Sequence, residues 1–191
     1  MIRVGFTGVP GAGKTSTARG LASTCRRIEK LKNIELLSEY ARRYIAKYGT
    51  VTQPWEQFRI FKKQLEWEDS VGYADILITD GPVFSSLVYA FMLSSGDTKE
   101  IMILDDLFSE MIKLNNPNPR YDVIFHIPPK LTPVVDGVRA KVQFDDLWRT
   151  NADSHLYSMY AYYLPPKHLH LVESVSMDDR VAECLEVLDS L

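Results

Sequence analysis

Short apolar segments alternate with longer amphipathic segments along the chain. The apolar segments end at glycines, acids or turns, as buried strands do, and cover Ile2–Thr7, Ile34–Leu37, Asp75–Thr79, Tyr121–Ile127 and Leu169–Glu173. Helical patterns cover Thr15–Cys25, Tyr40–Tyr48, Pro54–Asp69, Phe84–Leu93, Ile101–Leu114 and Asp178–Leu191. Strands separated by helices predict an α/β fold of three layers, in which helices cover both faces of a five-stranded, mostly parallel sheet.

Length and charge narrow the classes of protein to consider. A chain of 191 residues has the size of one domain, so we expect a single domain over residues 1–191. Its formal net charge of -3 gives no general attraction to nucleic acid or anionic membrane, although a local basic groove stays compatible with it. No apolar run approaches the ~20 residues of a membrane span, and the two cysteines lack metal-site spacing. We therefore expect a cytoplasmic protein with reduced thiols and no membrane partner.

Candidate chemistry begins where the first predicted strand ends. The run GVPGAGKT, Gly8–Thr15, fits the phosphate-binding pattern GxxxxGK[ST] without a mismatch, between a predicted strand and a predicted helix. Its glycines let backbone N–H groups face a phosphate, and the helix N-terminus adds partial positive charge. We expect ATP to be bound by Gly8, Gly11, Ala12, Gly13, Lys14, Thr15 and Ser16. Lys14 would neutralise the β- and γ-phosphates, and the Thr15 hydroxyl would bind Mg2+.

Two acids follow neighbouring predicted strands, Glu39 after the second and Asp80 after the third. Because parallel strands end at one edge of the sheet, both carboxylates should lie near the phosphates. Phosphoryl transfer to a hydroxyl needs one acid near the metal and one near the acceptor. We assign Asp80 to Mg2+ and Glu39 to the acceptor, as general base or hydroxyl anchor, although the two roles are interchangeable at this stage. The structural alternatives are a helix-start acid for Glu39 and a turn former for Asp80.

Several cations are candidates for neutralising the transferred charge. Arg42 and Arg43 follow Glu39 by one helical turn, so one of them contacts a substrate phosphate or Glu39, unless both lie on a solvated face. We expect residues 128–165 to form a lid over ATP, in which Arg139 follows the turn-forming pair Asp136-Gly137. Arg139 is therefore our candidate for stabilising the phosphate in transfer, with a surface position as the alternative. Asp145 and Asp146 should cap or pair within the lid helix.

Aromatic side chains are frequent, with Trp55, Phe58 and Phe61 at a helical spacing that is typical of packing. Other aromatic residues include Trp67, Phe84, Trp148, Tyr157, Tyr160, Tyr162 and Tyr163. One of the flanking rings could stack on the base of an acceptor.

In their order and spacing, four segments resemble the ribosylnicotinamide kinase-like P-loop proteins, of the type of the NadR kinase domain. They are Gly8–Thr15, the stretch SEYARRY at Ser38–Tyr44, Ile76–Asp80, and YDVI from Tyr121 leading to VDGVR at Val135–Arg139. The chain is similar, more loosely, to thymidylate and deoxynucleoside kinases. The resemblance implies the sheet order 2-3-1-4-5, ATP on the P-loop and the second-strand acid facing the acceptor. The segment GPVFSS after Asp80 differs from the family's ribosylnicotinamide-binding motif, which leaves the acceptor open.

These observations favour a kinase that uses ATP and Mg2+. The acceptor is a free nucleoside or nucleotide, or a hydroxymethylated pyrimidine such as 5-hydroxymethyluracil in DNA, which some bacteriophage kinases of this type phosphorylate. A DNA acceptor requires a basic strip, for which Arg42, Arg43, Arg59, Lys62 and Lys63 are candidates. The alternative is a P-loop NTPase that acts as a switch or assembly module, although no glutamate stands out to activate water. The NKxD motif with which GTPases recognise guanine does not occur in the sequence, which argues against a GTPase. The sequence leaves open whether the protein forms a homodimer.

Overall fold

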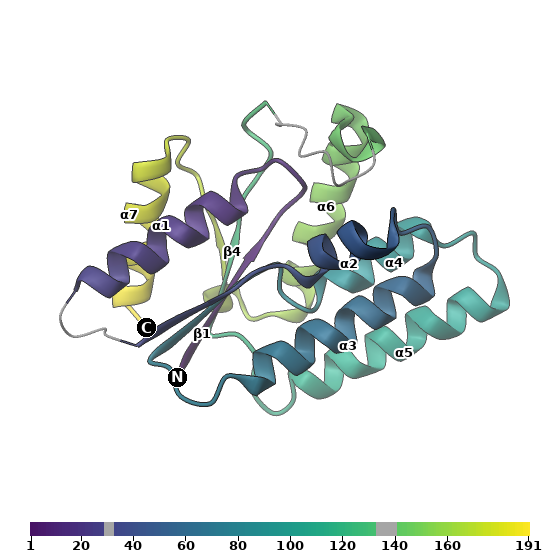
Figure 1. Ribbon diagram of the computed structural model, residues 1–191, viewed down its shortest axis with the longest axis horizontal. Coiled ribbons are helices and arrows are strands. Elements are labelled where there is room, and N and C mark those ends of the chain that lie inside the picture. The colour runs from purple at the N-terminus through teal and green to yellow at the C-terminus, as the bar shows by residue number, and fades with distance from the viewer. Residues whose placement is uncertain (29–32, 133–140) are drawn as a thin grey trace.

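The computed structural model describes residues 1–28, 33–132 and 141–191 of the chain (Figure 1). Five strands form one sheet: β1 Ile2–Thr7, β2 Ile34–Leu37, β3 Ile76–Asp80, β4 Val123–His126 and β5 Leu169–Leu171. Their order is β2-β3-β1-β4-β5, and each neighbouring pair is parallel. The predicted order and fold class are confirmed, with a sheet that is wholly rather than mostly parallel.

The described part of the chain contains seven α-helices: α1 Lys14–Arg27, α2 Tyr40–Tyr48, α3 Pro54–Ser70, α4 Ser85–Leu93, α5 Thr98–Leu114, α6 Asp146–Tyr163 and α7 Met177–Asp189. Two short 3-10 helices, Lys141–Phe144 and Pro166–His168, flank α6. In Figure 1, α1 and α7 lie together on one side of the sheet, and α2 to α6 lie on the other. This arrangement gives the three predicted layers.

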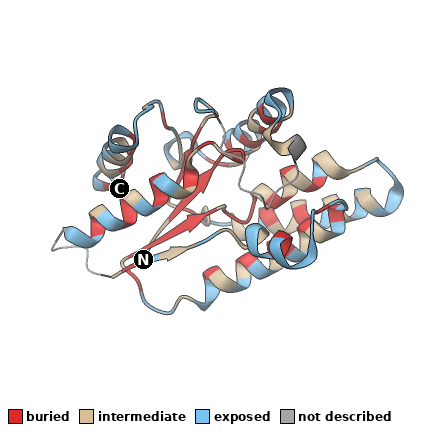
Figure 2. Cartoon of the chain, turned by 45° about the horizontal axis from the view of Figure 1, so that its top comes forward, coloured by how far each residue is buried: buried red, intermediate tan, exposed pale blue. Residues whose placement is uncertain are grey.

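Burial on both faces explains the apolar strands (Figure 2). All five residues of β3 and all four of β4 are buried, so these strands show continuous rather than alternating hydrophobicity. The parallel register pairs Phe6 of β1 with Asp80 and with Phe125. The carboxyl ends of β1, β3 and β4 therefore meet at one edge of the sheet, and the segments that follow them can build a common site.

Element boundaries differ from the predictions by a few residues. Strand β3 is shifted by one position, so that Asp80 is its last residue rather than the residue after it. Helix α5 begins three residues earlier than predicted, because the Asp97 carboxylate accepts hydrogen bonds from the N–H groups of Lys99 and Glu100. Strand β4 is shorter than predicted, although backbone hydrogen bonds continue beyond both of its ends, at Asp122 and Ile127.

Among the helices in the described ranges, none combines the length and apolar character that crossing a bilayer requires. Cys25 and Cys184 are both buried free thiols, and burial raises the pKa of each.

Candidate active site

The loop between β1 and α1 is shaped by close backbone packing. Gly8 has a φ of 134°, and a Cβ atom there would lie 2.3 Å from the Ile127 carbonyl oxygen. Only glycine can occupy that position, because a side chain would meet backbone that cannot move aside. The loop then turns into α1, and a cavity of about 290 Å3 opens beside it. The predicted phosphate-binding turn is therefore present, at the carboxyl edge of the sheet.

The cavity beside the P-loop is lined by Gly11, Gly13, Lys14, Thr15, Ser16, Glu39, Arg42, Leu131, Thr132, Phe144 and Met177. Five of the seven predicted nucleotide-binding residues are on this wall. Gly8 and Ala12 are not, because Gly8 packs against Ile127 and the Ala12 N–H donates to the Val9 carbonyl at 3.2 Å. Their contribution is to the shape of the loop.

Lys14 stands at the first position of α1 and is 8% exposed. Its ammonium group donates a hydrogen bond of 2.9 Å to the Val9 carbonyl within the same loop. The cation is thus held over the concave side of the P-loop, where it can neutralise phosphate oxygens.

Asp80 is in contact with Thr15 of the cavity wall, where the Thr15 hydroxyl donates to Oδ2 of Asp80 at 2.6 Å. Both are hard oxygen ligands of the kind that Mg2+ prefers. Adjacent ligands of an octahedral ion with bonds of 2.0–2.1 Å lie about 2.9 Å apart, close to this separation. Among the described residues, no three or more His, Cys, Asp or Glu side chains are grouped so that they could hold a metal ion by themselves. A hydroxyl and one carboxylate still suit Mg2+, because it usually completes its shell with phosphates and water.

Glu39 is positioned by the turn between β2 and α2. It occupies the N-cap position of α2, yet its side chain makes no capping hydrogen bond. The side chain instead lies against Gly81, where an added Cβ would be 2.9 Å from Cγ of Glu39. Gly81 has a φ of 84°, so a side chain there would also strain the backbone. The turns after β2 and β3 are therefore in contact, and they hold Glu39 beside the residue that follows Asp80.

The predicted arginines separate onto two surfaces. Arg42 lines the P-loop cavity together with Glu39. Arg43 points away from it, with its guanidinium carbon 4.5 Å from the centroid of the Trp67 ring. Consecutive helical residues point about 100° apart, so only one of the pair can face the cleft. Arg139 lies outside the residues that the structure describes.

The predicted lid segment contains buried polar groups in its described part. Arg149 on α6 is 3% exposed and donates to the Leu131 carbonyl at 3.2 Å. Asp145 caps α6 by accepting a hydrogen bond from the N–H of Trp148, as expected. His126, at the end of β4, lies 3.1 Å from the Asp153 carboxylate of α6.

A second cavity of about 110 Å3 adjoins the first, and its wall is mostly apolar. It is lined by Pro10, Glu39, Ala41, Ile45, Thr50, Val51, Gln57, Tyr89, Met92, Leu93, Gln143 and Trp148. The Tyr89 and Trp148 rings are parallel to within 5°, with centroids 6.3 Å apart. Glu39 belongs to both walls, so one carboxylate stands between the cavity beside the P-loop and an aromatic one.

Arg180 is a site residue that the sequence did not reveal. It is fully buried on α7, donates from Nη1 to the Ala12 carbonyl at 2.9 Å and from Nε to the Ser174 carbonyl at 3.0 Å. Burial lowers the pKa of its guanidinium, and Arg180 supports the P-loop from behind. A weak signal existed, because Arg180, Cys184 and Leu188 recur every four residues on one helical face.

Solved kinases share this fold. The structure of NadR protein in complex with NR has a TM-score of 0.74 and 18% identity, covering 99% of this chain and 49% of that chain. Thymidylate kinase from Ehrlichia chaffeensis has a TM-score of 0.64 and 18% identity, covering 98% of each chain. Deoxyadenosine kinase from M. mycoides, solved with dCMP and dCDP, has a TM-score of 0.65 and 12% identity, covering 100% of each chain.

The chain spans about half the length of the NadR protein, including a second structure with NAD and AMP-PNP that matches at a TM-score of 0.72. At such low identities these likenesses show the fold, which is that of the P-loop kinases, as the sequence resemblance implied.

A comparison with curated protein sequences found no match. A family model described as an AAA domain matches residues 3–180, from β1 into α7, and so includes the P-loop and both strand-end acids. Because the match extends over nearly the whole chain, the protein belongs to this AAA domain family.

Proposed function

We propose that this protein is a kinase that transfers the γ-phosphate of ATP to a hydroxyl of a nucleoside-type acceptor. The observation that carries the proposal is the place of Glu39, on the shared wall of the P-loop cavity and the Tyr89–Trp148 cavity. A triphosphate in the first cavity and a ring in the second would place the acceptor hydroxyl next to this carboxylate. The kinase fold of the structural neighbours supports the same reading.

The proposed reaction assigns a role to each group at the site. The acceptor oxygen forms a bond to the γ-phosphorus while the bond from that phosphorus to the β–γ bridging oxygen breaks, and ADP leaves with the electron pair. The acceptor proton passes to Glu39, acting as general base. Lys14 offsets charge on the β- and γ-phosphates, and Arg42 adds a second cation beside the acceptor. Thr15 and Asp80 would hold Mg2+, which neutralises phosphate oxygens when bound.

The shape of the second cavity supports a planar acceptor group. Tyr89 and Trp148 place parallel rings on the wall of this cavity, so a planar acceptor group can stack on a ring face there. Among solved neighbours, one NadR structure carries NR, and two others act on thymidylate and deoxyadenosine by name. We therefore place a free nucleoside or nucleotide first, with the ribosylnicotinamide type included.

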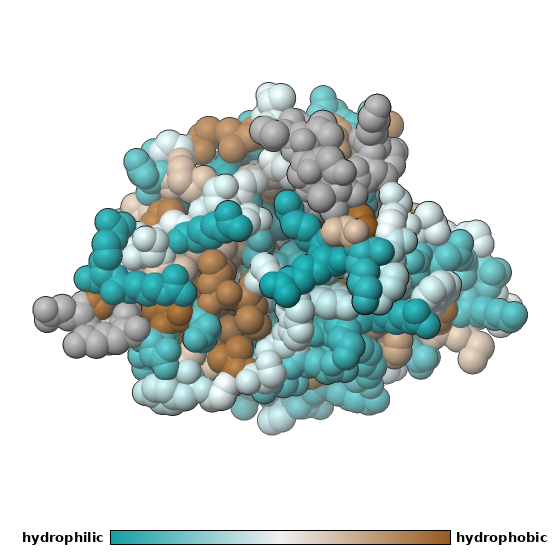
Figure 3. All heavy atoms as spheres, in the orientation of Figure 1, coloured by the Kyte–Doolittle hydropathy of each residue, from teal (hydrophilic) through white to brown (hydrophobic). Residues whose placement is uncertain are grey.

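A hydroxymethylated pyrimidine in DNA, such as 5-hydroxymethyluracil, is the second candidate. Cations and aromatic rings interleave on the outer faces of α2 and α3, where Figure 3 shows hydrophilic side chains gathered. Arg43 lies over Trp67, and Arg59 lies 4.6 Å from the Trp55 ring centroid. Such surfaces suit single-stranded nucleic acid. However, Lys62 pairs with Glu110 and Lys63 pairs with Glu66, which reduces the positive charge available to a phosphate backbone.

The test is a phosphate-transfer assay with γ-labelled ATP against nucleosides, mononucleotides and hydroxymethylpyrimidine-containing DNA, side by side. We expect label to appear on an acceptor, with little ATP consumption in its absence. Hydrolysis that proceeds equally without any acceptor would contradict the kinase and favour a P-loop switch or assembly module. Label on DNA alone would favour the second candidate. Sedimentation of the same sample tests the homodimer that the sequence leaves open.

A further inference from the structure

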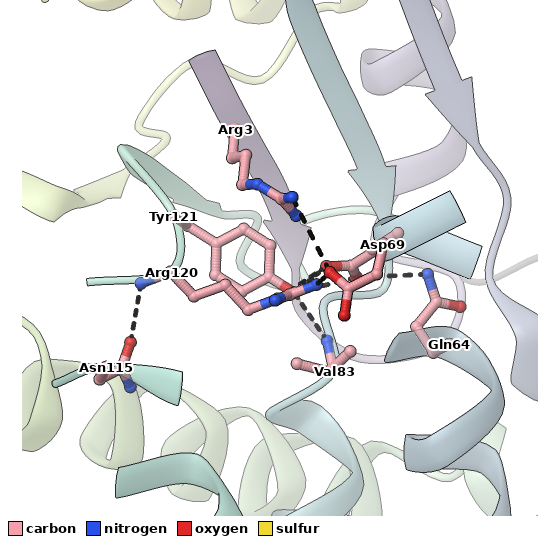
Figure 4. A network of polar contacts seen from close by, with 8 residues as sticks. Arg3, Gln64, Asp69, Val83, Asn115, Arg120 and Tyr121 are labelled. Carbon is pink, nitrogen blue, oxygen red and sulfur yellow. Dashed lines mark hydrogen bonds and ion pairs between the residues drawn. The ribbon is translucent and has the colours of Figure 1, made fainter. Parts of the chain in front are cut away.

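A fully buried carboxylate lies outside the two cavities. Glu68 of α3 is 0% exposed, and its partners Gln64, Arg120 and Tyr121 are labelled in Figure 4. Its side chain accepts hydrogen bonds from three residues, Gln64, Arg120 and Tyr121, and Tyr121 in turn accepts one from the backbone N–H of Val83. We call these residues the Glu68 network. None of the roles assigned above uses Glu68, so its burial calls for its own explanation.

One branch of the network reaches the turn that carries Glu39. The Gln64 side-chain N–H group donates to Oε1 of Glu68 at 3.4 Å. The Gln64 oxygen accepts a hydrogen bond of 2.9 Å from the backbone N–H of Tyr40. Tyr40 is the first residue of α2 and directly follows Glu39. Gln64 is 3% exposed, so this bridge is shielded from water and fixes the start of α2 against α3.

The other branch reaches the turn that follows Asp80. The Tyr121 hydroxyl lies 3.0 Å from both carboxylate oxygens of Glu68 and donates to one of them. The same hydroxyl accepts a 3.0 Å hydrogen bond from the backbone N–H of Val83, three residues after Asp80. Tyr121 and Val83 are each 1% exposed. Glu68 is therefore one bridging side chain away from each of the two strand-end turns.

Arg120 brings the opposite charge to the centre of the network. Its Nε donates to Oε2 of Glu68 at 3.1 Å, and its Nη2 donates to Asp69 at 2.8 Å. Burial raises the pKa of Glu68, while the charge of Arg120 and the hydrogen bond from Tyr121 oppose that change. A buried ion pair is a weak source of stability, because desolvation offsets most of its attraction. What the carboxyl group supplies here is two acceptor oxygens with fixed directions.

We propose that Glu68 is a positioning residue, which through Gln64 and Tyr121 holds the Glu39 turn and the Asp80 turn at a fixed separation. The inference rests on the proposed function, because it gives these two acids their roles. Contact between the turns makes the separation matter: Gly81, next to Asp80, lies against the Glu39 side chain. A shift of one turn therefore moves the base relative to the metal-binding acid, and misplacement by about 1 Å can cost about 100-fold in rate.

The test uses Tyr121→Phe and Gln64→Met, each of which removes one bridge and preserves size, together with Glu68→Gln. Hydrogen exchange should accelerate at the Val83 amide in Tyr121→Phe, at the Tyr40 amide in Gln64→Met, and at both in Glu68→Gln. Turnover in each should fall about 10- to 100-fold, with the KM for ATP little changed. The factor by which each change lowers turnover should be smaller in a Glu39→Gln background, because the base that these residues position is then absent.

The matched control is Glu100→Gln. The Glu100 carboxylate also accepts several hydrogen bonds, from Ser94 and Ser95, but touches neither strand-end turn. Its loss should lower the unfolding midpoint without changing turnover.

Wild-type turnover in Tyr121→Phe and Gln64→Met would overturn the inference, as would an undiminished loss in the Glu39→Gln background. Should Glu68→Gln fail to fold, the two bridge variants decide alone. If the wild-type protein phosphorylates no acceptor, the proposed function fails. Hydrogen exchange then tests the positioning role of Glu68 separately. Acceleration at the Tyr40 and Val83 amides in their respective variants supports Glu68 as the link, and unchanged exchange at both refutes it.

Discussion

The Thr15 hydroxyl donates a 2.6 Å hydrogen bond to the Asp80 carboxylate, joining residues that are 65 positions apart in sequence. Thr15 is the second residue of the helix that follows β1, and Asp80 ends β3, which pairs with β1. The parallel register brings the end of β3 next to the segment that follows β1, and the contact places a hydroxyl and a carboxylate together beside Lys14.

Asp80→Asn should lower phosphate transfer by about 100-fold or more and raise the Mg2+ concentration needed for half-maximal rate. The reason is that a neutral amide both binds Mg2+ more weakly and offsets less of its charge. The measurement is initial rate against Mg2+ at fixed ATP, with Thr15→Ser as the control that keeps the hydroxyl. An unchanged Mg2+ dependence in Asp80→Asn would remove this residue from the metal site.

Lys14→Met should abolish most transfer, on the order of 100-fold or more, while leaving the cooperative unfolding transition in place. Its ammonium group donates to the Val9 carbonyl in the loop that follows β1, so we expect the sheet to keep its structure. Lys14→Arg should not restore activity, because a planar guanidinium needs more room than a compact ammonium. Calorimetric titration with ATP and thermal unfolding separate the two effects. Lys99→Met, at an exposed position of α5, should match the wild type in both.

Glu39→Gln should reduce turnover by about 100- to 10,000-fold and leave ATP affinity unchanged, since the carboxylate acts on the acceptor side. The variant keeps side-chain size, so contact with Gly81 should persist. Single-turnover rates and equilibrium binding of ATP provide the comparison. Near-normal turnover would show that Glu39 is not the general base.

Trp148→Ala should raise the KM for a nucleoside acceptor roughly 5- to 100-fold, as expected for the loss of about 1–3 kcal/mol of ring stacking. The KM for ATP should stay the same, because Trp148 lines only the second of the two cavities. Tyr162→Ala is the control, since this tyrosine lies on the same helix and is 80% exposed. Equal effects on both substrates would place the acceptor elsewhere.

Glu183 should make stability depend on pH below neutrality. Burial alone would raise the pKa of its carboxyl, but hydrogen bonds from Ser174, from the backbone N–H of Glu173 and from His170 outweigh it and lower the pKa to about 2. An unfolded glutamate has a pKa of about 4.3. The stabilisation is therefore complete above that value and is lost as pH falls toward about 2.

Urea unfolding between pH 6 and pH 3 tests this assignment. The wild type should be more stable than Glu183→Gln at the higher pH, and the difference should shrink as the solution becomes more acidic. A difference that is constant with pH would mean that the carboxylate is not the group responsible.

Sequence by itself determined the parts of this protein that depend on local pattern. Buried strands need continuous apolar runs, and the phosphate-binding turn needs glycines in fixed positions, so the strands, the P-loop and the two strand-end acids could be identified in advance. The resemblance to P-loop kinases supplied the strand order.

Tertiary structure decided what depends on contacts between distant segments. Which of Arg42 and Arg43 faces the cleft follows from the rotation of α2 against α3, and a pair of adjacent arginines carries no sign of that rotation. The same holds for Arg180 behind the P-loop and for Glu68 between the two turns. In each case a polar side chain becomes buried because its partners lie on other elements, and only the packed chain brings those partners together.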